Sequence, residues 1–172
     1  MREITKKQMV DSIRDYHLPR FEELPDVGYY LEQTVIYINQ CIMPLGCSPI
    51  TGTMISNYVK NNVVPGPVKK LYYKEQIAHL IVIALTKNVL SLENICKLFC
   101  MQKGVYTDQI AYDYFCSELE NMLFYTFGVH DTVEQVGVTN SDLKIMLRGV
   151  IIALSQIIYL GRCFSAIEDE ED

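Results

Sequence analysis

A proline-glycine-proline break in the middle of the chain constrains the fold more than any other feature. Pro65 to Pro67 cannot lie inside an α-helix, because proline lacks the backbone N–H and clashes with the preceding turn. The residues after the break, Lys69 to Tyr73, end in strand-forming side chains. Helical patterns stand on both sides. The sequence therefore predicts a short wing over residues 63–73, between two helices.

The helix before the wing is predicted to be short. Thr51 is a candidate N-cap, and Asn62 is a residue that tolerates the left-handed conformation in which many helices end. Between them, apolar residues recur at three- and four-residue intervals, which is the spacing of a helix with one buried face. These residues are Met54, Ile55, Tyr58 and Val59.

Apolar residues at helical spacing predict six further helices. Thr5 with Gln8 forms a capping-box pattern, and Gly128 is a natural helix end. Four further helices have candidate N-caps: Asp26, Ser91, either Thr107 or Asp108, and either Asn140 or Ser141. The expected ranges are 6–17, 26–42, 74–85, 91–99, 107–128 and 140–167.

Basic residues are concentrated in the middle of an acidic chain. The whole sequence has a net charge of −6, whereas residues 53–103 hold seven lysines against two glutamates, a local net charge of +5. Phosphates are bound through clustered lysine and arginine. A basic centre between acidic flanks therefore fits a protein that offers one surface to an anion. The last five residues are all acidic, and we expect a disordered, solubilising tail there.

The cysteine pattern and the N-terminus favour a cytoplasmic protein. The six cysteines form no C-x-x-C pair, and the N-terminus lacks the order of a signal peptide. The longest apolar runs, residues 80–85 and 150–160, fall short of the roughly 18 residues that span a bilayer. We expect both runs to be buried helices, and no membrane contact.

Three motifs stand around the wing: T-G-T-M-I-S-N-Y-V-K-N-N-V-V-P, then K-K-L-Y-Y, then S-L-E-N-I. In their order and spacing they resemble the DNA-binding domain of the MerR regulator family. That family caps a short recognition helix with serine or threonine and ends it in a tyrosine, an apolar pair and a proline. A basic-x-tyrosine wing follows, and an S-L-x-x-I helix packs behind it. The matching residues here are Thr51, Tyr58, Val63, Val64, Pro65, Lys70, Tyr72, Ser91, Leu92 and Ile95. The resemblance implies a winged helix-turn-helix that places the helix at 52–61 in the major groove of DNA.

Some features depart from that family. Ser56 stands where its members usually carry arginine, Asn57 stands where they carry a second aromatic residue, and the wing is shorter. The C-terminal half also lacks their long coiled-coil dimerisation helix with metal-binding cysteines. We therefore carry over no metal and no cofactor, and a small-molecule effector stays unknown.

A second resemblance covers more of the chain, from Pro19 to Phe99. The segments P-R-F-E-E-L-P-D, N-Y-V-K and P-V-K-K-L-Y are similar to those of a bacterial family known only as a domain of unknown function. The similarity implies that Glu23 to Asp26 belong to the same structural unit as the helix-turn-helix. It supplies no activity.

Together these patterns predict an all-α protein built around a MerR-like winged helix-turn-helix with a short wing. We expect an N-terminal helical pair over residues 1–47, the helix-turn-helix over 48–103, a C-terminal helical region over 104–167 and an acidic tail over 168–172. The C-terminal region is expected to form a homodimer, to sense a ligand or to pack in the core.

The predicted function is regulation of transcription by binding double-stranded DNA, with the paired recognition helices of two copies about one DNA turn apart. Small polar side chains at the start of the recognition helix face the groove, and lysine and tyrosine side chains bind phosphates. Asn57 is the candidate for base recognition, because its amide pairs bidentately with adenine. The predicted DNA-binding residues are Thr51, Thr53, Ser56, Asn57, Tyr58, Lys60, Lys69, Lys70 and Tyr72.

Other functions were weighed against DNA binding. A protein-interaction module that keeps the same fold is the main alternative, since fold does not fix function. Tyr58 and Tyr72 are equally well explained as core aromatics. Cys96 and Cys100 share a helix face, as two ligands of a metal ion could, but free cysteines are mostly buried hydrophobes. His79, on an apolar helix, is expected to be a core residue. No catalytic motif has usable spacing, so we expect no enzyme.

Overall fold

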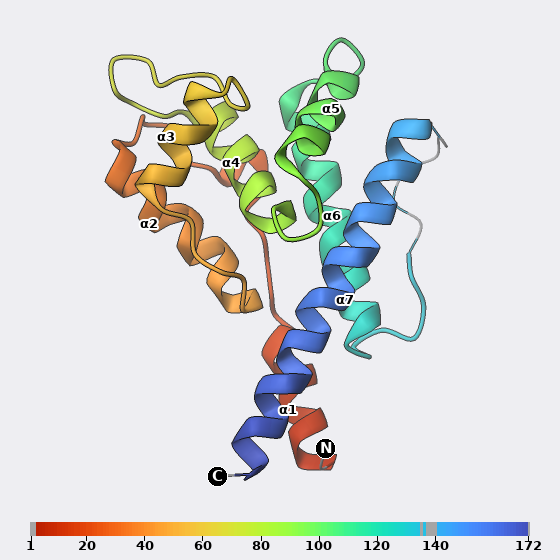
Figure 1. Ribbon diagram of the computed structural model, residues 1–172. Helices are drawn as coiled ribbons and strands as arrows, with labels where there is room; N and C mark the ends of the chain where they lie inside the picture. Colours follow the sequence, from red (N-terminus) through yellow and green to blue (C-terminus); the bar gives the residue numbers. More distant parts are fainter. Residues whose placement is uncertain (1–2, 135, 137–140, 172) are drawn as a thin grey trace.

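The computed structural model describes residues 3–134, 136 and 141–171, and within them the protein is built of α-helices (Figure 1). Two short 3-10 helices, η1 (Phe21–Glu23) and η2 (Met43–Leu45), stand between them. The α-helices are α1 (Glu3–Ile13), α2 (Leu31–Ile42), α3 (Gly52–Lys60), α4 (Lys74–Thr86), α5 (Leu92–Gln102), α6 (Asp108–Thr126) and α7 (Asp142–Glu171). The expectation of an all-α protein is confirmed.

Side-chain caps set the starts of four helices where the sequence predicted them. The Thr51 hydroxyl accepts a hydrogen bond from the Met54 N–H at 3.2 Å, which satisfies one of the free donors at the start of α3. Ser91 and Thr107 cap α5 and α6 in the same way. At α7 the cap is Ser141, whose hydroxyl accepts from the Lys144 N–H at 3.3 Å, while the alternative, Asn140, lies outside the described residues. Asn62 follows α3 with a φ of 56°, the left-handed conformation expected of it.

The predicted start of the second helix at Asp26 is wrong. α2 begins at Leu31, because the preceding residues pair with the wing, where Tyr29 and Tyr72 form an antiparallel bridge. The Asp26 carboxylate does not cap a helix but lies 2.6 Å from Lys74 Nζ. The sequence pattern did not reveal this partner because it is distant along the chain.

Both ends of the chain differ from expectation. α1 ends at Ile13 rather than near residue 17, and the buried side chains of Tyr16 and Leu18 follow it outside the helix. α7 continues through Glu171, so residues expected in a disordered tail are helical up to that point. Glutamate is a good helix former, and here it extends a helix that is already established.

α4 is the central helix of the fold. It contacts α2, α5, α6 and α7 (Figure 1), and one continuous hydrophobic core runs from Met9 in α1 to Ile158 in α7. A helix buried against neighbours on several sides carries apolar residues around most of its circumference instead of in one stripe. Its buried residues are Gln76, Ile77, Ala78, Leu80, Ile81, Ile83, Ala84, Leu85 and Thr86.

Hydrogen bonds hold the segment between α1 and α2 against α6. The Arg20 guanidinium binds both carboxylate oxygens of Glu120, at 2.8 and 2.6 Å. Glu120 also accepts a hydrogen bond from the Leu18 N–H, and Asp113 accepts one from the Phe21 N–H. Bidentate, charge-assisted bonds of this kind are strong and directional. They fix the path of the chain across α6.

α7 is long and apolar enough to cross a membrane by length and composition, over Asp142–Glu168. The separate apolar runs in the sequence did not suggest this. Ser155 and Gln156, which interrupt the apolar pattern, are uncharged and do not divide the helix. The core helix of a soluble protein meets the same criteria, so the property by itself assigns no location.

An ion pair between the buried Glu118 and the partly exposed Arg148 joins α6 to α7. The Glu118 side chain is fully buried, and neither of its carboxylate oxygens has a hydrogen-bond partner among the described residues. Its counter-charge is Arg148, whose Nε lies 3.4 Å from Glu118 Oε2. A buried carboxylate is costly unless it is paired, so the position of α7 depends on this contact.

We expect Arg148→Met to lower the free energy of unfolding by about 2 to 3 kcal/mol, because it leaves the Glu118 carboxylate buried without its counter-charge. Urea denaturation measures the change. The control is Arg14→Met, which removes an exposed pair with Asp11 and should change the stability by less than about 0.5 kcal/mol. Equal losses in the two variants would contradict the role of the buried pair.

Candidate nucleic-acid interface

One face of α3 is polar, uncharged at its start and exposed. Thr53, Ser56, Asn57 and Lys60 all lie on the surface, at spacings of three and four residues that bring them to one side of the helix. Thr51 is exposed directly before them and caps the helix. Five of the predicted DNA-binding residues therefore form one surface, which we call the α3 face.

Two of the predicted residues do not belong to this surface. Tyr58 is 8% exposed and Tyr72 is 4% exposed, and both are part of the hydrophobic core. Burial raises the pKa of both hydroxyl groups. The alternative that both are core aromatics is therefore confirmed for their rings, because the apolar positions on one side of α3 and in the wing turn inward, and phosphate binding by their hydroxyl groups stays a prediction.

The chain before α3 is fixed by one side chain from α2 and one from the residue that follows α4. The Asn39 amide in α2 makes a pair of hydrogen bonds with the backbone of Ile50, donating to its carbonyl at 2.9 Å and accepting from its N–H at 2.8 Å. Lys87, directly after α4, donates to the carbonyls of Ser48 and Pro49 at 2.9 and 3.1 Å. These bonds hold the start of α3 in place.

The wing ends in a two-residue hairpin. Val68 and Leu71 exchange two backbone hydrogen bonds of 2.9 Å, and between them Lys69 and Lys70 have φ values of 50° and 68°. Positive φ at both central positions is the mark of a type I′ turn, for which Asn-Gly is the favoured pair. Lysine in this conformation is strained by roughly 1 kcal/mol per residue. Two exposed lysines thus form the tip of the wing.

The base of the wing is anchored to the body. Gln76 in α4 donates a hydrogen bond to the Gly66 carbonyl at 2.8 Å. On the other side, Gly28 approaches the wing so closely that a Cβ there would lie 2.7 Å from the Cβ of Leu71 and 2.9 Å from the Tyr73 ring. The wing therefore fits against the segment before α2 only because residue 28 has no side chain.

The local positive charge divides into structural and surface lysines. Lys74 pairs with Asp26, and Lys97 pairs with Glu93 one turn away. Lys87 donates to backbone carbonyls, and burial lowers its pKa. In the part of the chain that the structure describes, four lysines of this region make neither an ion pair nor a side-chain hydrogen bond. They are Lys60, Lys69, Lys70 and Lys103.

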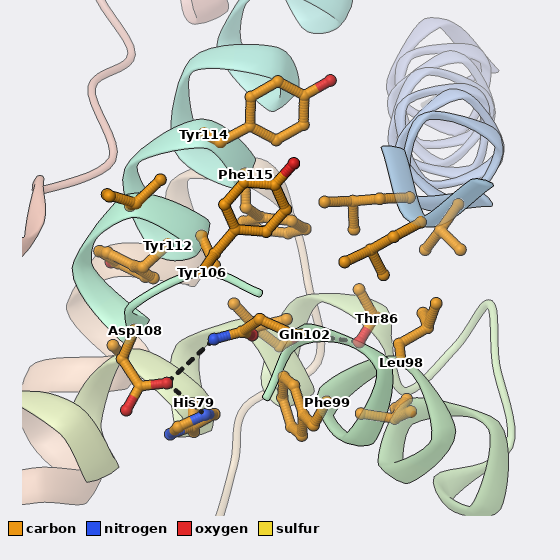
Figure 2. Close-up of a pocket in the computed structure, with 18 of the residues that line it drawn as sticks. His79, Thr86, Leu98, Phe99, Gln102, Tyr106, Asp108, Tyr112, Tyr114 and Phe115 are labelled. Carbon is orange, nitrogen blue, oxygen red and sulfur yellow. Dashed lines mark hydrogen bonds and ion pairs between the residues drawn. The ribbon is translucent and has the colours of Figure 1, made fainter. Parts of the chain in front are cut away.

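A cavity of about 130 Å³ lies between α4, α5, α6 and α7. Its walls are mainly apolar, and Asp108 on one edge accepts a hydrogen bond from Gln102 at 3.0 Å and lies 3.5 Å from His79 Nε2 (Figure 2). His79, expected to be a core residue, is partly buried; its ring packs edge-on against Phe99. Local sequence patterns do not reveal this cavity, because its residues come from four helices and the α5–α6 loop.

Cys96 and Cys100 show no metal-binding partners. Among the described residues, no group of three or more histidine, cysteine, aspartate or glutamate side chains is arranged to hold a metal ion. Both residues are free thiols on α5.

Residues 19–116 match the protein family described as Domain of unknown function (DUF1836). The chain belongs to this family. No curated protein matches the chain, and no solved structure matches it either. The DUF1836 segment contains the α3 face, the wing, α4 and α5, while α1 and α7 lie outside it. It also includes Arg20 and Asp113, which take part in the hydrogen bonds between the linker and α6.

We expect Asn39→Ala to destabilise the protein by about 1 to 3 kcal/mol, because it removes both bonds to Ile50 and leaves a partly buried backbone unsatisfied. The loss is measured by urea denaturation, and Gln40→Ala, at the exposed neighbouring position, is the control. A change no larger than that of the control would mean that the Asn39 bonds do not hold the start of α3.

Proposed function

We propose that the protein is a DNA-binding transcriptional regulator that inserts α3 into the major groove and contacts the flanking phosphates with its wing. The observation that carries the proposal is that Lys69 and Lys70 occupy the two central positions of the wing's left-handed turn, where asparagine and glycine are favoured. Strained conformations tend to persist at functional sites. The pair places two positive charges beside a helix whose exposed face carries no acid.

The α3 face has the chemistry that a groove requires. A helix N-terminus presents backbone N–H groups and a positive dipole end to an anion. Thr53 and Ser56 supply small hydroxyl groups, and Asn57 supplies an amide that can pair with adenine. Lys60 at the other end of the helix and the wing lysines would bind phosphates. The Asn39 and Lys87 bonds keep this helix in one orientation.

Replacing Lys69 with asparagine and Lys70 with glycine distinguishes the effect of the two charges on DNA binding from their effect on the stability of the protein. The Asn-Gly pair suits the left-handed turn, so we expect the variant to unfold at higher denaturant concentration, with a gain of about 1 kcal/mol. Its affinity for duplex DNA should nevertheless fall. The slope of log K against log salt concentration should decrease by about 2, since each lysine lost removes roughly one phosphate contact.

The measurement is fluorescence anisotropy with a randomised duplex library at several salt concentrations. The control variant, Lys97→Asn with Lys103→Gly, also removes two lysines, but from positions away from the wing; it should keep the wild-type salt slope. If the folded wild-type protein shows no salt-sensitive duplex binding, the DNA proposal fails. Binding of the α3 face to a protein partner then becomes the better explanation.

A second copy would dock on α7. The exposed side of this helix is mainly apolar. The two arginines of α7 contact the rest of the protein: Arg148 pairs with Glu118, and Arg162 donates a hydrogen bond to the Pro44 carbonyl. Such an apolar stripe, interrupted here by the uncharged Gln156, is typical of an interface. A dimer of this kind would present two recognition helices to one operator. The stripe consists of Ile145, Met146, Ile152, Ile157, Leu160, Phe164 and Ile167, which are between 41% and 63% exposed.

We expect Leu160→Glu with Phe164→Lys to convert a dimer into a monomer, as measured by analytical ultracentrifugation. The new side chains are spaced as a favourable helical ion pair, so α7 itself should persist. Val27→Glu with Val105→Lys changes two other exposed residues and should leave the dimer intact. A wild-type protein that is monomeric at all concentrations, or that requires lipid vesicles to stay in solution, would contradict docking of a second copy.

A further inference from the structure

The cavity between α4, α5, α6 and α7 has the size of one aromatic ring. Its volume is about 130 Å³, and an engineered apolar cavity of about 150 Å³ in another protein holds benzene. Well-packed protein interiors contain few voids larger than a water molecule. Phe99, Phe115 and Leu147 are among the apolar walls of this one, so the space is suited to a flat apolar group.

One edge of the cavity is polar and lies where three helices meet. It consists of His79 in α4, Gln102 at the end of α5 and Asp108 at the start of α6. Figure 2 shows these three side chains close together, joined by the contacts of the Asp108 carboxylate. We call these three residues the polar edge.

The contacts within the polar edge leave hydrogen-bond acceptors unused. His79 Nδ1 lies 2.8 Å from the Glu75 carbonyl oxygen, which can only accept, so the neutral ring has its proton on Nδ1 and a lone pair on Nε2. That nitrogen lies 3.5 Å from Asp108 Oδ1, which is too long for a good hydrogen bond. Asp108 Oδ1 accepts a bond from Gln102 Nε2 at 3.0 Å, whereas Asp108 Oδ2 accepts none from the described residues.

One donor stands beside these acceptors. Gln102 Nε2 carries two hydrogen atoms, and among the described residues the amide donates to Asp108 alone. A group bound at the polar edge therefore meets a carboxylate oxygen and an N–H together. A hydroxyl group uses both, because it donates one hydrogen bond and accepts another. A carboxylate would be repelled by Asp108, and an ammonium group could not accept from the N–H.

We infer that this cavity binds an uncharged monocyclic phenol, with its ring among Phe99, Phe115 and Leu147 and its hydroxyl group at the polar edge. The hydroxyl group donates to the Asp108 carboxylate and accepts from the Gln102 amide. A hydrogen bond to a carboxylate is shorter and stronger than one between two neutral groups, and this bond orients the ligand. The apolar walls exclude water from the ring.

The site lies where a bound molecule would act on the wing, and this part of the inference rests on the proposed function. Ala78 and Val82 of α4 line the cavity, while Gln76 at the start of the same helix holds the Gly66 carbonyl of the wing. One helix thus joins the cavity to the wing. We expect a ligand held between α4 and the ends of α5 and α6 to shift α4, and with it the wing, so the phenol is an effector of DNA binding.

The probe for the site is 4-fluorophenol, followed by ¹⁹F NMR on the full chain at neutral pH. We expect saturable binding with a Kd of about 1 mM or tighter, the range usual for a ligand of this size. Ala111→Leu adds three carbon atoms to a partly exposed side chain that lines the cavity, and should weaken binding at least tenfold. Ala153→Leu makes the same change at a partly exposed position that does not line it, and should bind like the wild type.

The role of the hydroxyl group is tested on the wild type with a series of ligands. We expect 4-fluoroanisole, which cannot donate, and 4-fluorobenzoate, which is an anion, each to bind at least fivefold more weakly than 4-fluorophenol. Binding of 4-fluoroanisole as tight as that of 4-fluorophenol overturns the hydrogen-bonded hydroxyl group. Tighter binding of 4-fluorobenzoate or of the cation 4-fluorobenzylamine overturns the choice of an uncharged ligand. This series needs no variant to fold.

The polar edge is tested with Asp108→Asn. This variant should bind 4-fluorophenol at least fivefold more weakly and 4-fluoroanisole as the wild type does, because only the phenol donates to the carboxylate. Asp131→Asn makes the same change at an exposed position after α6 and should alter neither affinity. Equal weakening of both ligands by Asp108→Asn overturns the assignment of the hydroxyl group to the polar edge. Absence of saturable binding to the wild type, or equal binding by Ala111→Leu and Ala153→Leu, overturns the site.

The two proposals fail in different experiments. The NMR titration contains no DNA, so its failure removes the effector site and leaves the DNA proposal intact. Conversely, loss of the DNA proposal leaves the titration unchanged. With both binding events present, saturating 4-fluorophenol should change the duplex affinity of the wild type at least threefold and that of Ala111→Leu not at all; an unchanged wild type would overturn the coupling.

Discussion

The burial of α4 is the constraint on which the rest of the structure depends. Because this helix has neighbours on several sides, its side chains must be apolar or internally hydrogen-bonded around most of its circumference. Gln76 meets this requirement by bonding to the backbone on both of its amide atoms, accepting from the Tyr73 N–H and donating to Gly66. The wing, the α2–α3 connection and the cavity are all arranged around that single helix.

The sequence best predicts structural features that depend on residues close to one another along the chain. Helix starts at Thr51, Ser91 and Thr107 were predicted correctly, because a cap acts on a backbone N–H three residues away. The predicted start at Asp26 failed because its carboxylate has a partner 48 positions along the chain, Lys74. Local patterns contain no information about such a partner. The same reason explains why Asn39 and the cavity were missed.

The candidate site was predicted in part. The α3 face and the wing lysines follow from helical spacing and from the proline-glycine-proline break, and both are exposed as expected. Periodicity alone could not decide whether Tyr58 and Tyr72 face the solvent or the core. A count of lysines likewise overstated the positive surface, since Lys74, Lys87 and Lys97 are engaged within the protein. The electrostatic contribution to DNA binding therefore rests on fewer side chains than the local net charge suggests.

The close approach at Gly28 determines how far the wing lies from the segment before α2. A Cβ at position 28 would lie only 2.7 Å from the Cβ of Leu71, so no second side chain fits between the two segments. Each carbon atom added at position 28 would push the wing, with its two lysines, outward. The substitution itself would lie far from any residue that faces a ligand or a groove. A larger side chain at this one position would therefore change the distance between the wing and α3.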